Sequence, residues 1–166
     1  MNQHIHYRDN ATRYFLDTEF MEDGKTIELL SLGIVCADGR EFYAVNSEAD
    51  HSHANDWVKA NVLPHLGTGP YMTRAGIRDE LLRFFPGHGN PEVWGYYSDY
   101  DWVLFCQLFG RMVDLPNFFP QFCMDLKQLS VELGSPRHPK QVGTEHNALN
   151  DARWNRDLFN YLRTVP

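Results

Sequence analysis

The sequence lacks several features that would define its class at once. No segment approaches the roughly 20 consecutive apolar residues that a membrane-spanning helix needs. Residues 1–13 contain no apolar stretch of the kind found in signal peptides. The three cysteines, Cys36, Cys106 and Cys123, are too few and too widely spaced for a disulfide framework or a paired-cysteine metal site. We therefore expect a cytoplasmic protein with reduced thiols and no membrane contact.

Basic residues are also scarce. The chain has 15 Lys and Arg against 22 Asp and Glu, a net charge of −7. This balance excludes a protein that coats nucleic acid through overall positive charge. It does not exclude an enzyme that acts on phosphates, because carboxylates that bind divalent cations also make a chain acidic. With 43% hydrophobic residues, the 166-residue chain can bury a core, which excludes a disordered protein.

The order of predicted elements indicates one α/β domain. Residues 1–12 are polar and without periodicity, so we interpret them as a leader in front of a domain spanning 13–166. Strands are predicted over 13–17, 27–36, 41–46 and 92–96, and helices over 56–63, 73–85, 101–109, 124–133 and 147–162. The first three strands follow one another across short turns, which favours an antiparallel meander. The whole pattern predicts a mixed β-sheet flanked by helices.

Two carboxylates stand at the end of the first predicted strand. Side chains alternate along a strand, so Asp17 and Glu19 point to the same side. At such a position they repel each other unless a cation lies between them, and oxygen ligands suit Mg²⁺ or Mn²⁺. Taken alone, such a pair is more often part of a solvated turn.

Further candidates lie at the starts of two predicted helices. Ser98, Asp99 and Asp101 follow the strand 92–96. Taken alone, the segment is typical of a helix start, with Ser98 or Asp99 as the cap and Asp101 favourable to the dipole; of the two acids we expect Asp99 to be the cap and Asp101 the ligand. His146 and Asp151 open the last helix, five residues apart. That spacing places them on different sides of a regular helix, so we expect His146 on the entering loop and Asp151 pointing inward.

These residues, in this order, resemble the motifs of the DEDDh 3′-to-5′ exonucleases. Asp17 and Glu19 match the first motif, Asp101 the second, and His146 and Asp151 the third. The segments 14–35, 39–45 and 100–110 are similar to the RNase AS family, described as polyadenylate-specific exoribonucleases. The stretch around Glu28 is similar to the one that follows the first motif in RNase T and oligoribonuclease.

The resemblance implies an RNase H-like fold and a two-metal hydrolysis of RNA from its 3′ end, with nucleoside 5′-monophosphates as products. It implies two Mg²⁺ ions, replaceable by Mn²⁺, with Asp17 between them. Glu19 and Asp151 would stand near the attacking water, Asp101 would hold the leaving-group ion, and His146 would take the proton. It further implies a preference for adenylate-rich ends and a homodimer.

Substrate contacts are predicted beside the acids. Phe20, Met21 and Trp102 can stack on or wedge against bases, although core packing explains Trp102 equally well, and Glu28 is a further candidate. The phosphates of a bound nucleic acid can meet either of two basic sets: Arg74 with Arg78, or Lys127 with Arg137 and Lys140. Both sets are equally typical of a solvated surface.

Two other functions stay open. A DEDDh exonuclease that acts on DNA ends needs the same acids. A nucleic-acid-binding module that has lost catalysis would keep the fold, although the presence of all five catalytic residue types argues against it.

Overall fold

The structure, a computed structural model, describes residues 11–87 and 90–165. It contains a six-stranded mixed sheet in the order β4-β3-β2-β1-β5-β6. The strands are β1 (Thr12–Glu22), β2 (Ile27–Cys36), β3 (Glu41–Asn46), β4 (Tyr71–Met72), β5 (Pro91–Gly95) and β6 (Met124–Asp125). The predicted mixed sheet is confirmed. The predicted leader lies outside the described residues as far as residue 10.

The meander of the first three strands is also confirmed. β1 pairs antiparallel with β2, and β2 antiparallel with β3, across the predicted turns. β5 then adds in parallel on the other side of β1, and the two-residue strands β4 and β6 add in parallel at the two edges. The two short strands were not predicted, because two residues show no alternation.

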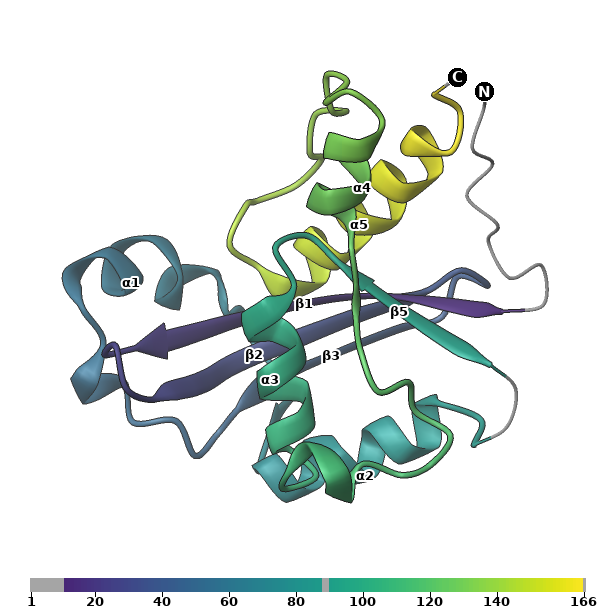
Figure 1. The fold of residues 1–166 in the computed structure, drawn as a ribbon. Coiled ribbons are helices and arrows are strands. Elements are labelled where there is room, and N and C mark those ends of the chain that lie inside the picture. The colour runs from purple at the N-terminus through teal and green to yellow at the C-terminus, as the bar shows by residue number, and fades with distance from the viewer. Residues whose placement is uncertain (1–10, 88–89, 166) are drawn as a thin grey trace.

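Helices cover both faces of this sheet (Figure 1). The bounds are α1 (Asp56–Asn61), α2 (Arg74–Phe84), α3 (Asp99–Gln107), α4 (Leu126–Glu132) and α5 (Ala148–Leu162). α2 and α3 lie on one face, where Tyr14 and Leu16 of β1 meet Ile77 and Phe105. α4 and α5 lie on the other face, where Phe15 packs with the core of α5. The alternation of β1 thus places odd-numbered side chains under α5.

Helix starts follow local capping chemistry. The Thr73 hydroxyl accepts the backbone N–H of Gly76 at the start of α2, and the Asn147 side chain accepts that of Asn150 at the start of α5. Of the described residues, none belongs to a helix that is both long enough and apolar enough to cross a bilayer.

Three boundary predictions are corrected. β1 does not end at Asp17 but continues to Glu22, because pairing with β2 persists across a register shift after Glu19. The helix predicted over 124–133 starts at Leu126, since Met124 pairs with β5. Asp99 does not cap α3 with its side chain: Ser98 holds the cap position.

Candidate active site

The site forms where β5 separates from β1. The two strands pair only as far as Phe15 and Trp94, so one edge of β1 has no strand partner beyond that point. Side chains from two helices form hydrogen bonds with this unpaired edge instead. Asn155 of α5 donates to the carbonyl oxygen of Leu16 at 2.9 Å. On α3, Asp101 accepts the backbone N–H of Thr18 at 2.9 Å. The free edge of β1 therefore fixes the positions of α3 and α5.

Three carboxylates converge on the α5 side of β1. One oxygen each of Asp17, Glu19 and Asp151 lies within 4.8 Å of the others. Asp17 and Glu19 share a face, as predicted, and Asp151 points at them from the first turn of α5. The sequence alone gave no signal for what brings α5 so close: Gly33 stands opposite Asp17 in β2, and its missing side chain leaves room for the backbone of Ala148.

The carboxylates are electrostatically unfavourable without a cation. Burial, followed by repulsion from the neighbouring acids, raises the pKa of Asp17 well above its ordinary value. Burial and the Asp151 carboxylate raise the pKa of Glu19 to about 8. Burial also raises the pKa of Asp151, partly offset by a hydrogen bond from Gln141. The cluster therefore favours protonation, or a cation, at neutral pH.

Asp101 lies at the margin of this cluster and is not one of the three converging ligands. It is only 5% exposed, and one of its oxygens accepts both the backbone N–H and the hydroxyl of Thr18, at 2.9 and 2.5 Å. Burial raises its pKa to about 7, although the two Thr18 bonds oppose the shift. Because Asp101 and Asp17 repel each other, the two carboxylates belong to one electrostatic unit.

His146 stands on the loop before α5, as predicted. Its backbone is in the left-handed region, with φ of 62°, a conformation that is uncommon outside glycine and often found at functional sites. The imidazole meets the ring of Trp57 in α1 edge-on, with centroids 5.0 Å apart. The next residue, Asn147, donates to the carbonyl oxygen of His65 at 2.8 Å, which fixes this loop against the η2 turn (Leu63–His65).

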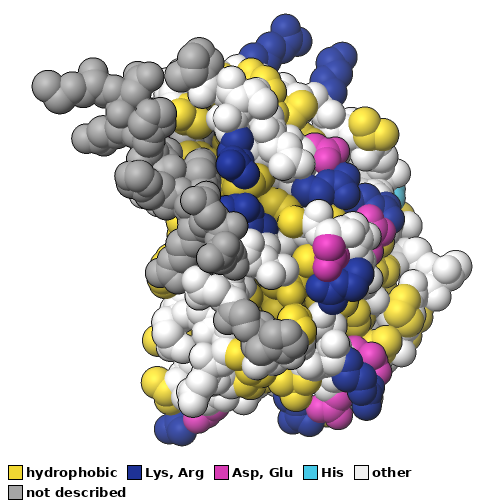
Figure 2. Space-filling model, turned by 90° about the vertical axis from the view of Figure 1, so that its right-hand side faces the viewer, with side chains coloured by type: hydrophobic (Ala, Val, Ile, Leu, Met, Phe, Trp, Pro, Cys, Tyr) yellow, Lys and Arg dark blue, Asp and Glu magenta, His cyan; other side chains and the backbone are white. Residues whose placement is uncertain are grey.

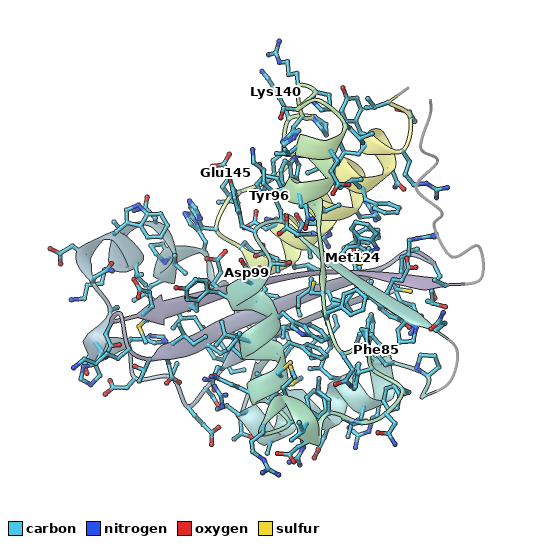
Figure 3. All side chains as sticks on the ribbon, viewed as in Figure 1. Phe85, Tyr96, Asp99, Met124, Lys140 and Glu145 are labelled. Carbon is cyan, nitrogen blue, oxygen red and sulfur yellow. The ribbon has the colours of Figure 1, made fainter. Side chains whose placement is uncertain are left out.

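A cavity of about 190 Å³ opens over these groups. It is lined by Asp17, Tyr96, Gln141, Glu145, His146, Asp151, Trp154 and Asn155. Figure 3 shows Tyr96 and Glu145 reaching into the same region above Asp99 from different segments.

Sequence reasoning missed three supporting residues of this site. Asn155 lies one turn after Asp151 on the same helix face, a spacing that could have identified it. Gln141, which donates to Asp151 from a loop, and Trp57 gave no such signal, because only the fold brings them near.

The four predicted substrate-binding residues do not lie together in one site. Phe20 stacks on Tyr100 with centroids 5.4 Å apart, and in the chain Phe20 directly follows Glu19 and Tyr100 directly precedes Asp101. Met21 and Glu28 line a second cavity of about 340 Å³ at the β1–β2 end. Trp102 is largely buried and stacks on Phe105 in the core, in line with its packing alternative.

The residues present fit divalent cations. Asp17, Glu19 and Asp151 offer converging hard oxygen donors, and no basic side chain forms an ion pair with these three in the described part of the chain. A cation would relieve the repulsion that raises their pKa values. The chemistry of the donor set thus suits Mg²⁺ or Mn²⁺.

Comparisons with known proteins agree with this geometry. Residues 12–163 match the model of the 3′-5′ exoribonuclease Rv2179c-like domain. The chain is 45% identical, over 146 residues, to the 3′-5′ exoribonuclease Rv2179c of Mycobacterium tuberculosis H37Rv, covering 85% of this chain and 87% of that protein. The same figures hold for the 3′-5′ exoribonuclease MT2234.1 of M. tuberculosis CDC 1551.

Two solved structures share the fold at 12% identity. The nuclease domain of 3′hExo, a DEDDh family member bound to rAMP, superposes with a TM-score of 0.56, covering 95% of this chain and 93% of that one. S. pombe Pop2p in its Mg²⁺- and Mn²⁺-bound form superposes with a TM-score of 0.55, covering 92% and 82%. The RNase H-like fold predicted by resemblance is confirmed.

Proposed function

Because the chain belongs to the 3′-5′ exoribonuclease Rv2179c-like domain family, we propose that it removes nucleotides one by one from RNA 3′ ends. Each step hydrolyses the terminal phosphodiester bond and releases a nucleoside 5′-monophosphate. The observation that carries this proposal is the convergence of Asp17, Glu19 and Asp151, two of which, Asp17 and Asp151, line one cavity together with His146.

In this proposal Asp17, Glu19, Asp101 and Asp151 hold two Mg²⁺ ions, and Mn²⁺ can replace them. The three converging carboxylates provide the main donor set, and Asp101 contributes the oxygen that Thr18 does not occupy. Divalent cations bound there would activate a water and neutralise charge on the phosphate. Gln141 and Asn155 would keep α5 and its carboxylate in place.

His146 would take the proton from the attacking water. Neutral imidazole suits this task near neutral pH. The position of His146 in the lining of the cavity, with Trp57 against its ring, supports the role because the ring is held beside the carboxylates.

We also propose a preference for adenylate-rich ends. The second cavity, at the β1–β2 end, is lined by Met21, Thr26, His53 and four carboxylates, those of Glu22, Asp23, Glu28 and Asp50. Ionised carboxylates only accept hydrogen bonds. They therefore suit the exocyclic amino group of adenine or cytosine, and disfavour uracil.

The decisive experiment is digestion of 3′-tailed RNAs that differ only in the base composition of the tail, with Mg²⁺, with Mn²⁺ and with EDTA. We expect mononucleotide products that require the metal and form fastest from adenylate tails. A matched DNA oligomer tests the DNA alternative. Binding of RNA without any hydrolysis in Mg²⁺ or Mn²⁺ would identify the chain as a binding module.

The proposal includes a homodimer, which the family resemblance implies. Exposed apolar side chains such as Val103 and Val113 offer surface for it. Light scattering coupled to size exclusion should give about twice the chain mass of 19.3 kDa.

A further inference from the structure

Tyr97 is an exposed ring on a constrained backbone at the rim of the cavity. It lies in the connection between β5 and α3, and its side chain is 63% exposed. Its φ of 57° lies in the left-handed region, which bulky side chains adopt at an energetic cost. Among the described residues, only Ser135 and His146 share this property outside glycine. The surrounding fold therefore holds the backbone of Tyr97 in a conformation that this residue rarely adopts.

The neighbours of Tyr97 join it to the catalytic cavity. Its ring meets that of Tyr96 edge-on, with centroids 4.8 Å apart, and Tyr96 lines the cavity. On the other side, the ammonium group of Lys127 in α4 lies over the Tyr97 ring, 5.9 Å from its centroid. The wall of the cavity thus continues onto the surface as an aromatic ring with one cation beside it.

Lys127 and the two other members of its basic set, Arg137 and Lys140, differ from most other cations in the described part of the chain. Seven arginines form ion pairs with carboxylates: Arg13, Arg40, Arg78, Arg83, Arg111, Arg153 and Arg156. Figure 2 shows one face on which basic side chains lie beside acidic ones in this way. Across residues 11–87 and 90–165, Lys127, Arg137 and Lys140 have no carboxylate within ion-pair distance.

Of the two basic sets predicted from the sequence to contact phosphates, only the set of Lys127, Arg137 and Lys140 has all its members outside ion pairs in the described part of the chain. Arg78 pairs with Asp79, which leaves Arg74 without its neighbour. Lys140 is exposed between two anchored residues: the Pro139 carbonyl accepts the Trp154 indole N–H at 3.0 Å, and Gln141 donates to Asp151. Figure 3 shows the Lys140 side chain extending away from the protein.

We propose that Tyr97 and Lys127 form a binding subsite for the single-stranded RNA that precedes the terminal nucleotide, with a base stacked on the ring and a phosphate against the ammonium. Arg137 and Lys140 would extend the basic track for nucleotides further from the end. Aromatic rings next to cations are the usual means of binding single strands without sequence preference. This inference rests on the proposed function, since it assumes that a 3′ end occupies the neighbouring cavity.

The test measures how affinity depends on RNA length. Adenylate oligomers of one to six nucleotides carry a 5′ fluorophore, and anisotropy is recorded in Ca²⁺, with product analysis to confirm that they stay intact. The wild-type protein should gain affinity as nucleotides are added before the terminal one. Tyr97→Ala should lose about 5-fold or more of that gain, the range that stacking of one base provides.

Matched variants distinguish the loss of the Tyr97 ring from a general effect of substitution on RNA binding. Tyr97→Phe keeps the ring and should bind like wild type. Tyr71→Ala removes another exposed tyrosine, 55% exposed in β4, and should also bind like wild type. Lys127→Gln should reduce the slope of log Kd against log salt by about 0.7, the contribution of one phosphate contact on a single strand. Circular dichroism and thermal melting establish that each variant is folded.

The subsite is refuted if Tyr97→Ala retains the full length-dependent gain, or if it loses affinity for AMP by the same factor as for the hexamer. The proposed function fails separately, if the wild-type protein neither hydrolyses RNA in Mg²⁺ or Mn²⁺ nor binds any of the oligomers.

Discussion

Gly33 in β2 and Ala148 in α5 approach so closely that a side chain on Gly33 could not fit. A methyl group there would overlap the Ala148 carbonyl and come within 2.5 Å of the next amide nitrogen, that of Leu149. Gly33 also stands directly opposite Asp17 in the β1–β2 ladder. The distance between the sheet and the helix that carries Asp151 is therefore set beside Asp17, one of the three converging carboxylates.

Gly33→Ala should lower both stability and activity. The methyl group must push α5 away from the sheet, and overpacking of this kind costs about 1–3 kcal/mol. Because Asp151 moves with α5, we expect Mn²⁺ affinity to fall as well. Gly76→Ala is the control, since its new methyl group meets only the Thr73 and Met72 side chains, at 3.3 and 3.5 Å. Unchanged Mn²⁺ affinity in Gly33→Ala would contradict this role.

Thr18→Val should impair the positioning of Asp101. The hydroxyl of Thr18 is lost, and with it the shorter of the two bonds to the Asp101 carboxylate. Hydrogen bonds to a carboxylate lower its pKa, so their removal raises the pKa of Asp101 further above 7. The acid limb of the pH–rate profile should move to higher pH, and kcat should fall by about tenfold at neutral pH. Thr18→Ser, which restores the hydroxyl, should return the profile to that of wild type.

His146→Ala should remove most of the turnover but not the fold. Loss of a positioned general base typically costs about 10²- to 10⁴-fold in rate. RNA binding in Ca²⁺ should persist, because the carboxylates and the aromatic residues remain. Tyr71→Ala, which alters an exposed side chain that lines neither cavity, serves as the control. Wild-type turnover in His146→Ala would remove the residue from the mechanism.

The metal-free protein should become less stable as pH rises from about 5 to 8. The ordinary pKa of Glu19 is 4.5 and its folded-state pKa is about 8, so over this interval the folded state binds more protons than the unfolded state. Stability is then lost as pH rises through this interval, and the raised pKa of Asp17 acts in the same direction. Thermal melting in EDTA should show the decline, and Mg²⁺ should reduce it.

A companion variant tests the origin of that decline. Glu19→Gln removes one buried charge and should stabilise the metal-free protein at pH 8 by about 1 kcal/mol or more, while abolishing metal-dependent hydrolysis. A Glu19→Gln protein that melts with the wild-type pH dependence would show that repulsion in the cluster does not limit stability.

The sequence predicted well those features that depend on neighbours along the chain. Strands β2 and β3 were predicted at their observed bounds, because alternation and turn residues specify them. The facing of Asp17 and Glu19 follows from the period of a strand, and the inward position of Asp151 from the pitch of a helix.

It failed where pairing partners are distant. The end of β1 was predicted too early because polar residues there are held by β2, and the strand over Met124 and Asp125 exists only because β5 accepts it. Gln141 and Trp57 are separated from the acids by loops and have no spacing that points to the site.

Local sequence thus determined which side chains are available and which way each points from its own element. The tertiary structure decided the distances between them: β5 leaves β1 early, the free edge of β1 binds Asp101 and Asn155, and Gly33 admits α5. The physical reason is that hydrogen-bond periodicity is a property of consecutive residues, whereas convergence of charged groups depends on contacts between elements far apart in the chain, which no single segment encodes.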